Sequence, residues 1–325
     1  MSAFGGEEDE IRRLVIDCDP GHDDAIAILV ALAQPRWRVD GITVVAGNQT
    51  LDKTVRNALQ VLTVAGRTHV PVYAGMDRPL VRDLVTAEHV HGESGLEGPA
   101  LPEPGVKAQP EHAVDWLARH LREAGAPIDV AAVGPLTNLA LVLRREPDLA
   151  RSIGRLVVMG GAVGEGNITP SAEFNIFVDP EAAAIVFGAG IPLTMVGLDV
   201  THQALLPRAE FAAIRALGGP VPEMVADLLD YFAGFHQQVY AFDGVPIHDA
   251  CAVAALFEPT LLTTRRLRVD VETRGQFTDG RTVCDLWGVT GRQPNAEVAV
   301  GIDRDGFLDL LTASLWRLAT PPAPA

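Results

Sequence analysis

Short apolar runs alternate with longer amphipathic segments over most of the chain, and this alternation predicts its secondary structure. The first run, residues 13–16, precedes the turn residues Pro20 and Gly21, and a continuously apolar segment begins at Ala25. This order is typical of a buried strand, a tight turn and a buried helix. The same alternation predicts further strands at 38–46, 70–74, 128–133, 156–159 and 192–196, and helices at 53–65, 111–124, 135–144 and 180–188. We therefore expect an α/β fold with an open, mostly parallel sheet and helices on both of its faces.

The pattern changes in three places. Residues 76–110 are rich in Gly, Pro, His and Glu and keep no sustained period, which in a compact domain usually marks a functional loop. The stretch 207–257 is helical in pattern, and one helix begins within it at residues 246–249. The remainder predicts an antiparallel extension of the sheet and a closing helix, with strands at 267–272, 282–286 and 297–300 and the helix at 304–318.

The chain offers no internal repeat and no linker that would mark a domain boundary. We therefore expect one domain over residues 13–318, flanked by a flexible segment at 1–12 and a disordered tail at 319–325. In a parallel sheet, ligands bind where the carboxyl ends of the strands meet. The turn at 17–24, Asn48, Val133 and the loop that begins at Gly160 would all emerge at that edge.

Composition narrows the possible partners. The 325 residues are 48% hydrophobic and carry a formal charge of -16, which argues against nucleic acids and anionic membranes as partners. Three scattered cysteines indicate buried, reduced thiols rather than a disulfide framework. Residues 1–10 lack the pattern of a signal peptide, and no stretch reaches the roughly 18 apolar residues of a membrane span. We expect a cytoplasmic protein.

Four carboxylates, Asp17, Asp19, Asp23 and Asp24, fall within eight residues around the first turn. Each alone could be a helix cap or a satisfied buried group, but together at a strand end they would resist ionisation unless a cation lay among them. Because no cluster of His or Cys ligands lies nearby, calcium or magnesium is favoured over zinc.

Two other groups of polar residues are candidates. His248 and Asp249 follow a Gly-Val-Pro turn and begin a predicted helix, where a helix cap is the alternative explanation. Asn167, Glu173 and Asn175 bring two amides and a carboxylate into one irregular stretch, which suits recognition of hydroxyl groups, although a polar loop is the default.

Two enzyme classes lack support. The glycines at 160–166 do not have the spacing of a dinucleotide-binding loop. Ser94 lies in the long loop rather than at a strand-to-helix turn, so it is not the nucleophile of a serine hydrolase.

The sequence DCDPGHDDA at 17–25 resembles the signature of the nucleoside hydrolases, the inosine-uridine-preferring N-ribohydrolase family. Further segments resemble motifs of that family in the family's order, over roughly residues 13–318. They are GNQT at 47–50, HGESG at 91–95, GPLTN at 134–138, MGG at 159–161, EFN at 173–175, DPEA at 179–182 and HD at 248–249. The resemblance implies the family's Rossmann-like nucleoside hydrolase fold and a ribonucleoside substrate.

The resemblance also implies the layout of a calcium site. Calcium would be held by the side chains of Asp19, Asp24 and Asp249 and by the main-chain carbonyl of Val133, with Asp17 supporting these ligands from behind. The residues implied to bind the ribose are Asp23, Asn48, Asn167, Glu173 and Asn175.

A direct displacement with inversion follows from this layout. Asp19 would take a proton from a water activated by the calcium, and the water would attack the anomeric carbon of an oxocarbenium-like ribosyl group. His248 would be the general acid for the leaving base, because the pKa of a histidine lies near neutrality. His91 and Tyr240 resemble residues on the base side of members that act on pyrimidines.

Some roles remain open at this point. Met159 and Phe174 could form apolar walls of the site, although core packing explains Met159 equally well. His22 and His236 have no assigned role. The expected substrates are pyrimidine nucleosides or a mixed inosine-uridine range, and a purine-preferring hydrolase is the alternative.

Two alternative functions would require different residues in the matched motifs. A metal-dependent phosphohydrolase would need a cationic phosphate clamp, and the matched motifs contain no Lys or Arg. A non-catalytic nucleoside- or sugar-binding protein would dispense with Asp19 or His248, and both are present. The resemblance further suggests a homo-oligomer, either a dimer or a tetramer, that acts in nucleoside breakdown or salvage.

Overall fold

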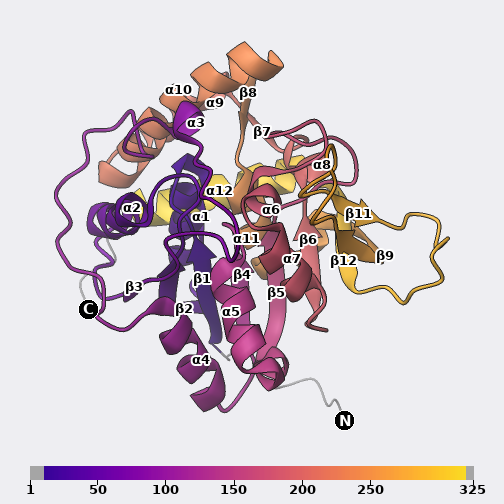
Figure 1. Cartoon of the computed structure of the whole chain (residues 1–325). Coiled ribbons are helices and arrows are strands. Elements are labelled where there is room, and N and C mark those ends of the chain that lie inside the picture. Colours follow the sequence, from indigo (N-terminus) through magenta and orange to yellow (C-terminus); the bar gives the residue numbers. More distant parts are fainter. Residues whose placement is uncertain (1–10, 320–325) are drawn as a thin grey trace, which may run out of the picture.

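The computed structural model describes residues 11–319, in which helices cover both faces of an eight-stranded sheet (Figure 1). The strands of this sheet are β1 (Arg12–Cys18), β2 (Trp37–Val44), β3 (Val72–Ala74), β4 (Ile128–Ala132), β5 (Ile153–Met159), β6 (Leu193–Val196), β9 (Leu262–Leu267) and β12 (Ala296–Ile302). Their order across the sheet is β3-β2-β1-β4-β5-β6-β12-β9. All neighbours are parallel except β9, which pairs antiparallel with β12. The predicted α/β class is thus confirmed.

The helices vary from single turns to one of 21 residues. They are α1 (His22–Leu32), α2 (Leu51–Val64), α3 (Glu88–His91), α4 (Ala113–Glu123), α5 (Thr137–Arg145), α6 (Phe174–Val178), α7 (Pro180–Phe187), α8 (Leu198–Thr201), α9 (Arg208–Ala216), α10 (Pro220–Tyr240), α11 (His248–Phe257) and α12 (Arg304–Ala319). Two short 3-10 helices, Pro147–Ser152 and Pro259–Leu261, complete the regular structure. The expected flexible segment 1–12 and tail 319–325 lie outside the described residues, apart from Ile11, Arg12 and Ala319.

Strand β1 shows how the sheet divides the core. Leu14, Ile16 and Cys18 pack in the hydrophobic cluster that includes α1, α2, α10, α11 and α12. Val15 packs on the opposite face, in the cluster that includes α4, α5 and α7. Successive side chains of a strand point to opposite faces, and a strand buried on both faces must be apolar at every position. This explains the continuous apolar run that marked β1 in the sequence.

The sheet has a switch point between β1 and β4. From β1 the chain builds outward through β2 and β3, and it then returns to place β4 on the other side of β1. The connections that follow β1 and β4 therefore diverge and leave a crevice at the carboxyl ends of these strands. Asp19 follows β1 and Val133 follows β4, so both lie at this crevice.

The C-terminal third forms the predicted antiparallel extension only at the edge of the sheet, where β9 pairs with β12. β10 (Val269–Val271) and β11 (Thr282–Cys284) pair only with each other, while β12 lies parallel to β6 in the main sheet. Within 207–257, which is helical in pattern, β8 (Gly244–Pro246) pairs with β7 (Leu205–Pro207). Strands of three residues are too short to show a period, and a period never identifies the partner of a strand.

The long segment 76–110 contains only the single-turn helix α3. It is nevertheless tied to the rest of the molecule. The guanidinium of Arg82 forms ion pairs with Glu181 and Asp279 and donates to the carbonyl of Thr273 at 3.0 Å. These contacts anchor the loop to α7 and to the turn that precedes β11.

Two expectations from composition concern cysteines and membranes. Cys18 and Cys251 are buried free thiols, as expected, whereas Cys284 is only partly buried. Among residues 11–319, no helix is long and apolar enough to cross a membrane.

The packing of α12 against the sheet can be tested with two phenylalanines. Phe307 on α12 is fully buried, whereas the side chain of Phe277 is 79% exposed. We expect Phe307→Ala to lower the free energy of unfolding by about 3–5 kcal/mol, because it removes apolar contacts and leaves a cavity. Phe277→Ala removes the same atoms and should change stability by less than about 0.5 kcal/mol. Urea unfolding of both variants at one protein concentration measures this, and equal effects would contradict the assigned packing.

Candidate active site

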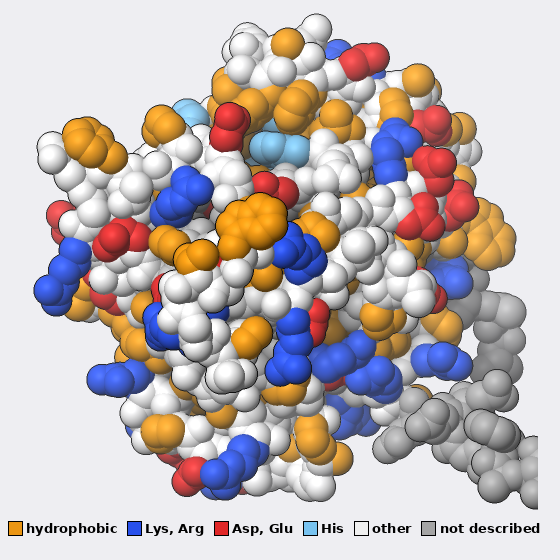
Figure 2. All heavy atoms as spheres, turned by 90° about the vertical axis from the view of Figure 1, so that its right-hand side faces the viewer, with side chains coloured by type: hydrophobic (Ala, Val, Ile, Leu, Met, Phe, Trp, Pro, Cys, Tyr) orange, Lys and Arg blue, Asp and Glu red, His pale blue; other side chains and the backbone are white. Residues whose placement is uncertain are grey.

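A cavity lies at the carboxyl ends of the strands, with about 680 Å³ of empty space when its solvent-filled mouth is counted. This size is within the range of small-molecule sites. Figure 2 shows histidine side chains in a recess on one face of the molecule, bordered by hydrophobic groups. The cavity is lined by Asp23, Asn48, Ala87, His89, Val90, His91, Val133, Met159, Asn167, Ile168, Glu173, Phe174, Asn175, His202, Phe232, Phe235, His236, Tyr240, His248 and Asp249. Every residue predicted to bind the ribose or the base is among them.

Asp24 shapes the turn that connects β1 to α1. Its Oδ1 accepts the backbone N–H of Asp19 at 3.1 Å, and its Oδ2 accepts that of Gly21 at 2.9 Å. A carboxylate that satisfies free N–H groups at a helix start stabilises that start. Helix α1 therefore begins at His22, three residues before the predicted apolar start, and Asp23 and Asp24 lie in its first turn.

Asp19 lies fully buried at the floor of the crevice, just beyond the end of β1. Its Oδ2 accepts the backbone N–H of Asn48 at 2.6 Å, whereas its Oδ1 is buried and has no hydrogen-bond partner among the described residues. A Cβ atom at Gly47 or Gly134 would lie 2.1 Å or 2.5 Å from a carboxylate oxygen of Asp19. The glycines of both motifs are thus required for the close approach of the chain to this carboxylate.

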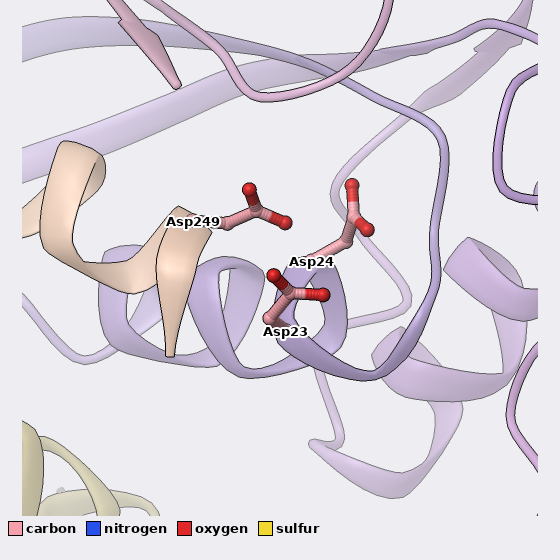
Figure 3. Close-up of side chains that lie close together, drawn as sticks. All are labelled: Asp23, Asp24 and Asp249. Carbon is pink, nitrogen blue, oxygen red and sulfur yellow. The ribbon is translucent and has the colours of Figure 1, made fainter. Parts of the chain in front are cut away.

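Three carboxylates converge beside Asp19. Asp23, Asp24 and Asp249 each have an oxygen within 4.8 Å of an oxygen of the other two. Figure 3 shows their side chains pointing toward one another, two from α1 and one from the start of α11. The sequence predicted Asp23 as a ribose contact and Asp19 as a metal ligand. The structure adds Asp23 to the carboxylates that could hold a cation.

The charges of these carboxylates are not balanced by basic side chains. Within residues 11–319, none of Asp17, Asp19, Asp23, Asp24 and Asp249 forms an ion pair with Lys or Arg. Burial, followed by repulsion from Asp24, raises the pKa of both Asp19 and Asp23 well above the ordinary value. Burial and the proximity of Asp23 do the same to the pKa of Asp249.

Asp17 lies behind this group and is held by neighbouring strands. Its Oδ1 accepts hydrogen bonds from the hydroxyl of Thr43 at 2.5 Å and from the amide of Asn138 at 2.9 Å. Burial outweighs these bonds and raises the pKa of Asp17 to about 6. Asp17, like Asp19 and Asp24, is not among the residues that line the cavity, and its Oδ2 is buried without a hydrogen-bond partner among the described residues. Its supporting role stays a prediction.

Glu173 and Asn175 hold the opposite wall in place. The carboxylate of Glu173 caps α6 and accepts three backbone N–H groups, from Gly161, Asn175 and Ile176. The side-chain amide of Asn175 donates to the carbonyl of Val133 at 2.9 Å and to that of Met159 at 3.1 Å. The carbonyl of Val133, predicted to be a metal ligand, is therefore already oriented toward the cavity wall.

Asn167 and Phe174 belong to the same wall. The side-chain oxygen of Asn167 accepts the backbone N–H of Phe174 at 2.9 Å, which leaves its amide nitrogen free to donate. Phe174 is 8% exposed and Met159 is 3% exposed, so both are largely core residues that present an edge to the cavity.

His248 is the first residue of α11 and lines the cavity. Its Nδ1 lies 2.7 Å from the hydroxyl of Thr201. Burial and the neighbouring histidines, His202 first, lower the pKa of His248 well below its ordinary value. The ring is therefore neutral at pH 7, whereas the sequence alone suggested a pKa near neutrality.

The long loop delivers His91 to the cavity. The side chain of Gln49 donates to the carbonyl of Gly92 at 3.0 Å, and Asn57 donates to that of Ser94 at 2.9 Å. The motif at 91–95 is thereby fixed to the segment that follows β2. His91 is 5% exposed and lies against His22, with ring centroids 5.2 Å apart.

Helix α10 forms one wall of the cavity, of which the sequence predicted only Tyr240. Phe232, His236 and Tyr240 lie four residues apart on α10, which places them on one face of the helix, and all three line the cavity. This spacing is visible in the sequence and could have added Phe232 and given His236 a place. His202 also lines the cavity, with its ring centroid 5.5 Å from that of His248, and no sequence pattern pointed to it.

The arrangement fits a hard divalent cation. Buried carboxylates lie beneath the cavity, and Oδ1 of Asp19 and Oδ2 of Asp17 have no hydrogen-bond partner among the described residues. Within residues 11–319, no Lys or Arg forms an ion pair with these groups. Such a set of like charges is destabilising unless protons or a cation separate them, and carboxylate oxygens are the ligands that Ca²⁺ and Mg²⁺ prefer. Above the floor, amide and carboxylate groups offer hydrogen bonds to a polyol.

Comparison with known proteins agrees with this geometry. Residues 14–309 match the family model described as inosine-uridine preferring nucleoside hydrolase. The chain is 54% identical over 303 residues to the pyrimidine-specific ribonucleoside hydrolase RihA of Citrobacter koseri. The aligned residues make up 93% of this chain and 97% of that protein. The RihA of Enterobacter sp. (strain 638) is 52% identical over the same shares of the two chains.

Solved structures show the same relationship. A purine-preferring ribonucleoside hydrolase from Gardnerella vaginalis superposes with a TM-score of 0.90 at 34% identity, covering 95% of this chain and 99% of the other. The plant nucleoside hydrolase PpNRh1 gives a TM-score of 0.88 at 32% identity over 96% and 100% of the two chains. The resemblance found in the sequence motifs is thus confirmed: the chain belongs to the inosine-uridine preferring nucleoside hydrolase family.

Proposed function

We propose that this protein hydrolyses the N-glycosidic bond of pyrimidine ribonucleosides, giving ribose and free base, with calcium bound at the acidic floor of the cavity. The observation that carries the proposal is the buried, unpartnered Oδ1 of Asp19 beside the converging carboxylates of Asp23, Asp24 and Asp249. A binding protein would have no need for a strong base in that position.

Asp19, Asp24, Asp249 and the carbonyl of Val133 would hold the calcium, and Asp23 is close enough to take part. Calcium supplies, when bound, a positive charge that polarises water and the ribose hydroxyls that reach it. Hydrogen bonds within the protein already hold these metal-binding groups in place. Asn48 donates to Asp19 and Asp24 through its backbone and side chain, and Asn175 donates to the carbonyl of Val133.

The ribose would be bound by groups of the cavity wall. Asp23, Asn48, Asn167, Glu173 and Asn175 all line the cavity near the acidic floor. Burial raises the pKa of Glu173 to about 7, and its three backbone N–H partners make it a rigid acceptor. Such fixed acceptors and donors hold the sugar with its anomeric carbon facing Asp19.

Asp19 would take a proton from the attacking water at Oδ1. Its Oδ2 is engaged by the backbone N–H of Asn48, so only Oδ1 is available as a base. Calcium beside this carboxyl would keep it ionised and therefore able to accept a proton.

His248 would donate a hydrogen bond from its neutral ring to the departing base. In the neutral ring, the hydroxyl of Thr201 can donate to Nδ1 at 2.7 Å, and the ring proton then lies on Nε2. This nitrogen is the only one left to face the cavity. A leaving pyrimidine gains negative charge as the glycosidic bond breaks, so a donor at this position stabilises the transition state.

Pyrimidine preference rests on the RihA relatives at 52–54% identity, both of which are named pyrimidine-specific. The aromatic and imidazole rings of His91, His236 and Tyr240 on the base side agree with it. A purine preference is the second candidate, because the enzyme from Gardnerella vaginalis has the same fold and is named purine-preferring. Its lower identity, 34%, makes it the weaker guide.

We further propose, from the family resemblance, that the protein is a cytoplasmic homo-oligomer, a dimer or a tetramer. Its role would be in nucleoside breakdown or salvage.

Replacement of Asp19 tests the general base. Asp19→Asn keeps an oxygen for the N–H of Asn48 but cannot accept a proton, so kcat for uridine should fall by about 10²–10⁴-fold. Asp305→Asn is the control, because the side chain of Asp305 is 91% exposed on α12. Initial rates of base release measure both. Turnover of Asp19→Asn within a few-fold of wild type would contradict the assignment.

Metal dependence can be measured in two ways. Treatment with a calcium chelator should abolish turnover, and added Ca²⁺ should restore it. Independently of activity, Ca²⁺ at 100 times its Kd should stabilise the folded wild type by about 2.7 kcal/mol, seen as a rise in Tm. Asp249→Asn should lose most of this rise. Activity or a Tm that is indifferent to chelation would refute the calcium site.

Substrate preference follows from kcat/KM measured on four nucleosides. Uridine and cytidine should exceed inosine and adenosine by at least about 10-fold, a ratio that contacts in one pocket can supply. The reverse order would favour the purine-preferring alternative. Tight binding of nucleosides without any release of base would instead indicate a binding protein.

A further inference from the structure

The glycine loop, residues 160–164, follows β5 and lies beside the cavity wall that carries Glu173, and the proposed hydrolysis gives it no role. Four consecutive backbone N–H groups of this loop donate to side chains rather than to other backbone groups. The acceptors are Glu173 for Gly161, Thr282 for Ala162, and Asp199 for both Val163 and Gly164, at 2.6–2.9 Å. The surrounding side chains therefore determine the shape of the loop.

The first of these bonds joins the loop to Glu173, which is proposed to bind the ribose. The carboxylate of Glu173 accepts two N–H groups from α6 itself, those of Asn175 and Ile176, and these move with the helix. Among the described residues, the N–H of Gly161 is its only hydrogen-bond donor from another element. Oε1 accepts a single bond, so it keeps a lone pair for a hydroxyl group of a ligand. The orientation of this carboxylate in the cavity therefore depends on where Gly161 lies.

Gly161 packs closely against Thr282. The φ angle of Gly161 is 75°, in the left-handed region, and a Cβ atom there would lie 2.7 Å from both Cγ2 and Oγ1 of Thr282. Glycine permits both this backbone conformation and this close approach. The side chain of Thr282 thus fixes the place of the residue that donates to Glu173.

The hydroxyl of Thr282 makes two hydrogen bonds to the next residue of the loop. It accepts the backbone N–H of Ala162 at 2.9 Å and donates to the carbonyl of the same residue at 2.7 Å. Thr282 is 2% exposed and Ala162 is 3% exposed, so water has little access to these bonds. Among the described residues, these two backbone groups have no other partner. Loss of the hydroxyl would leave a buried donor and a buried acceptor unsatisfied, so the loop would have to shift.

This hydroxyl comes from the hairpin that lies outside the main sheet. Thr282 is the first residue of β11, which pairs only with β10. The guanidinium of the preceding residue, Arg281, donates to the carbonyl of Val163 at 3.2 Å, so the hairpin holds two successive residues of the glycine loop. The hairpin thereby supports the cavity wall across a separation of 120 residues in sequence.

We propose that Thr282 is a positioning residue. Through Ala162 and Gly161, its hydroxyl holds the carboxylate of Glu173 in the orientation that accepts a hydroxyl group of the bound ribose. The inference rests on the proposed function, because it takes a nucleoside as the ligand. Thr282 itself does not line the cavity, so its influence on a substrate passes through the glycine loop. The β10–β11 hairpin thereby takes part in substrate binding.

Two substitutions at position 282 separate this role from packing. Thr282→Val has nearly the same shape but no hydroxyl, whereas Thr282→Ser keeps the hydroxyl and loses only a methyl group. A contact that the substrate and the transition state share affects KM rather than kcat. We expect Val to raise KM for uridine by about 10-fold, the size expected for one lost hydrogen bond. The kcat of the Val variant, and both constants of the Ser variant, should stay within about 3-fold of wild type.

Thr63→Val is the matched control. The hydroxyl of Thr63 on α2 likewise accepts one backbone N–H, from Gly105 at 2.9 Å, and donates to one carbonyl, that of Leu59 at 2.7 Å. None of these three residues lines the cavity, so Thr63→Val should leave KM for uridine unchanged. A rise in KM equal to that of Thr282→Val would overturn the proposal, as would a Ser variant at position 282 that behaves like Val.

Ribose analogues show whether the effect passes through Glu173. The inhibition constants of 2′-, 3′- and 5′-deoxyuridine against uridine hydrolysis are measured for wild type and Thr282→Val. The substitution should weaken binding of the analogues that keep the hydroxyl group bound by Glu173, and it should have no effect on the analogue that lacks this group. An equal loss of affinity for all three analogues would overturn the proposal, because it would reflect a general change in the cavity.

Amide hydrogen exchange of residues 160–164 tests the support of the loop without turnover. These amides should be protected in wild type and Thr282→Ser and should exchange at least about 10-fold faster in Thr282→Val. Equal protection in wild type and the Val variant would overturn the proposal. If wild type hydrolyses no nucleoside, the proposed function fails, yet hydrogen exchange still decides whether Thr282 holds the loop.

Discussion

The mutual repulsion of buried carboxylates is the constraint on which this structure depends. Asp17, Asp19, Asp23, Asp24 and Asp249 are each at most 6% exposed, and within the described chain none is paired with a basic side chain. Backbone N–H groups and amides stabilise part of this charge, through Asp24 at the start of α1 and through Asn48. The negative charge that these groups do not stabilise faces the cavity. This charge enables the site to attract a cation and to remove a proton from water.

The topology explains why such a costly group can be assembled. The carboxylates come from the ends of β1 and from the start of α11, which lie more than 200 residues apart in sequence. The switch point between β1 and β4 opens the crevice, and α11 packs against α1 to bring Asp249 to it. Two hydrophobic clusters, one on each face of the sheet, hold these elements. Burial of apolar surface therefore offsets the electrostatic cost of the site.

The sequence predicted the parts of this arrangement that depend on local chemistry. The apolar run of β1, the acidic turn and the motifs at the strand ends could be located from residue types and spacing alone. Partners across space could not: β10 and β11 form a hairpin outside the main sheet, and Asp23 joins the converging carboxylates rather than only facing the sugar. On α10 only Tyr240 was predicted. Phe232 and His236 were not placed in the cavity although the three residues recur every four positions, because an aromatic stripe on a helix is more often core than ligand site. His202 could not be predicted, because it follows the single-turn helix α8 and no sequence pattern indicates that this turn lies at the cavity.

The histidines around the cavity obey the same principle as the carboxylates, namely that a buried group takes its state from its hydrogen-bond partners. Burial lowers the pKa values of His22 and His236 to about 4 and that of His91 well below the ordinary value, so none of these rings carries charge at neutral pH. Each neutral ring then carries one N–H proton, and the hydrogen-bond partner of the ring determines which of its two nitrogens holds that proton. The carbonyl of Phe232 accepts at 3.0 Å from Nδ1 of His236, which leaves Nε2 of that ring bare. The hydroxyl of Thr201 can do the opposite for His248 by donating to its Nδ1. The carbonyl behind His236 and the hydroxyl behind His248 thus determine which nitrogen of each ring faces the cavity, and so whether that ring accepts or donates a hydrogen bond there.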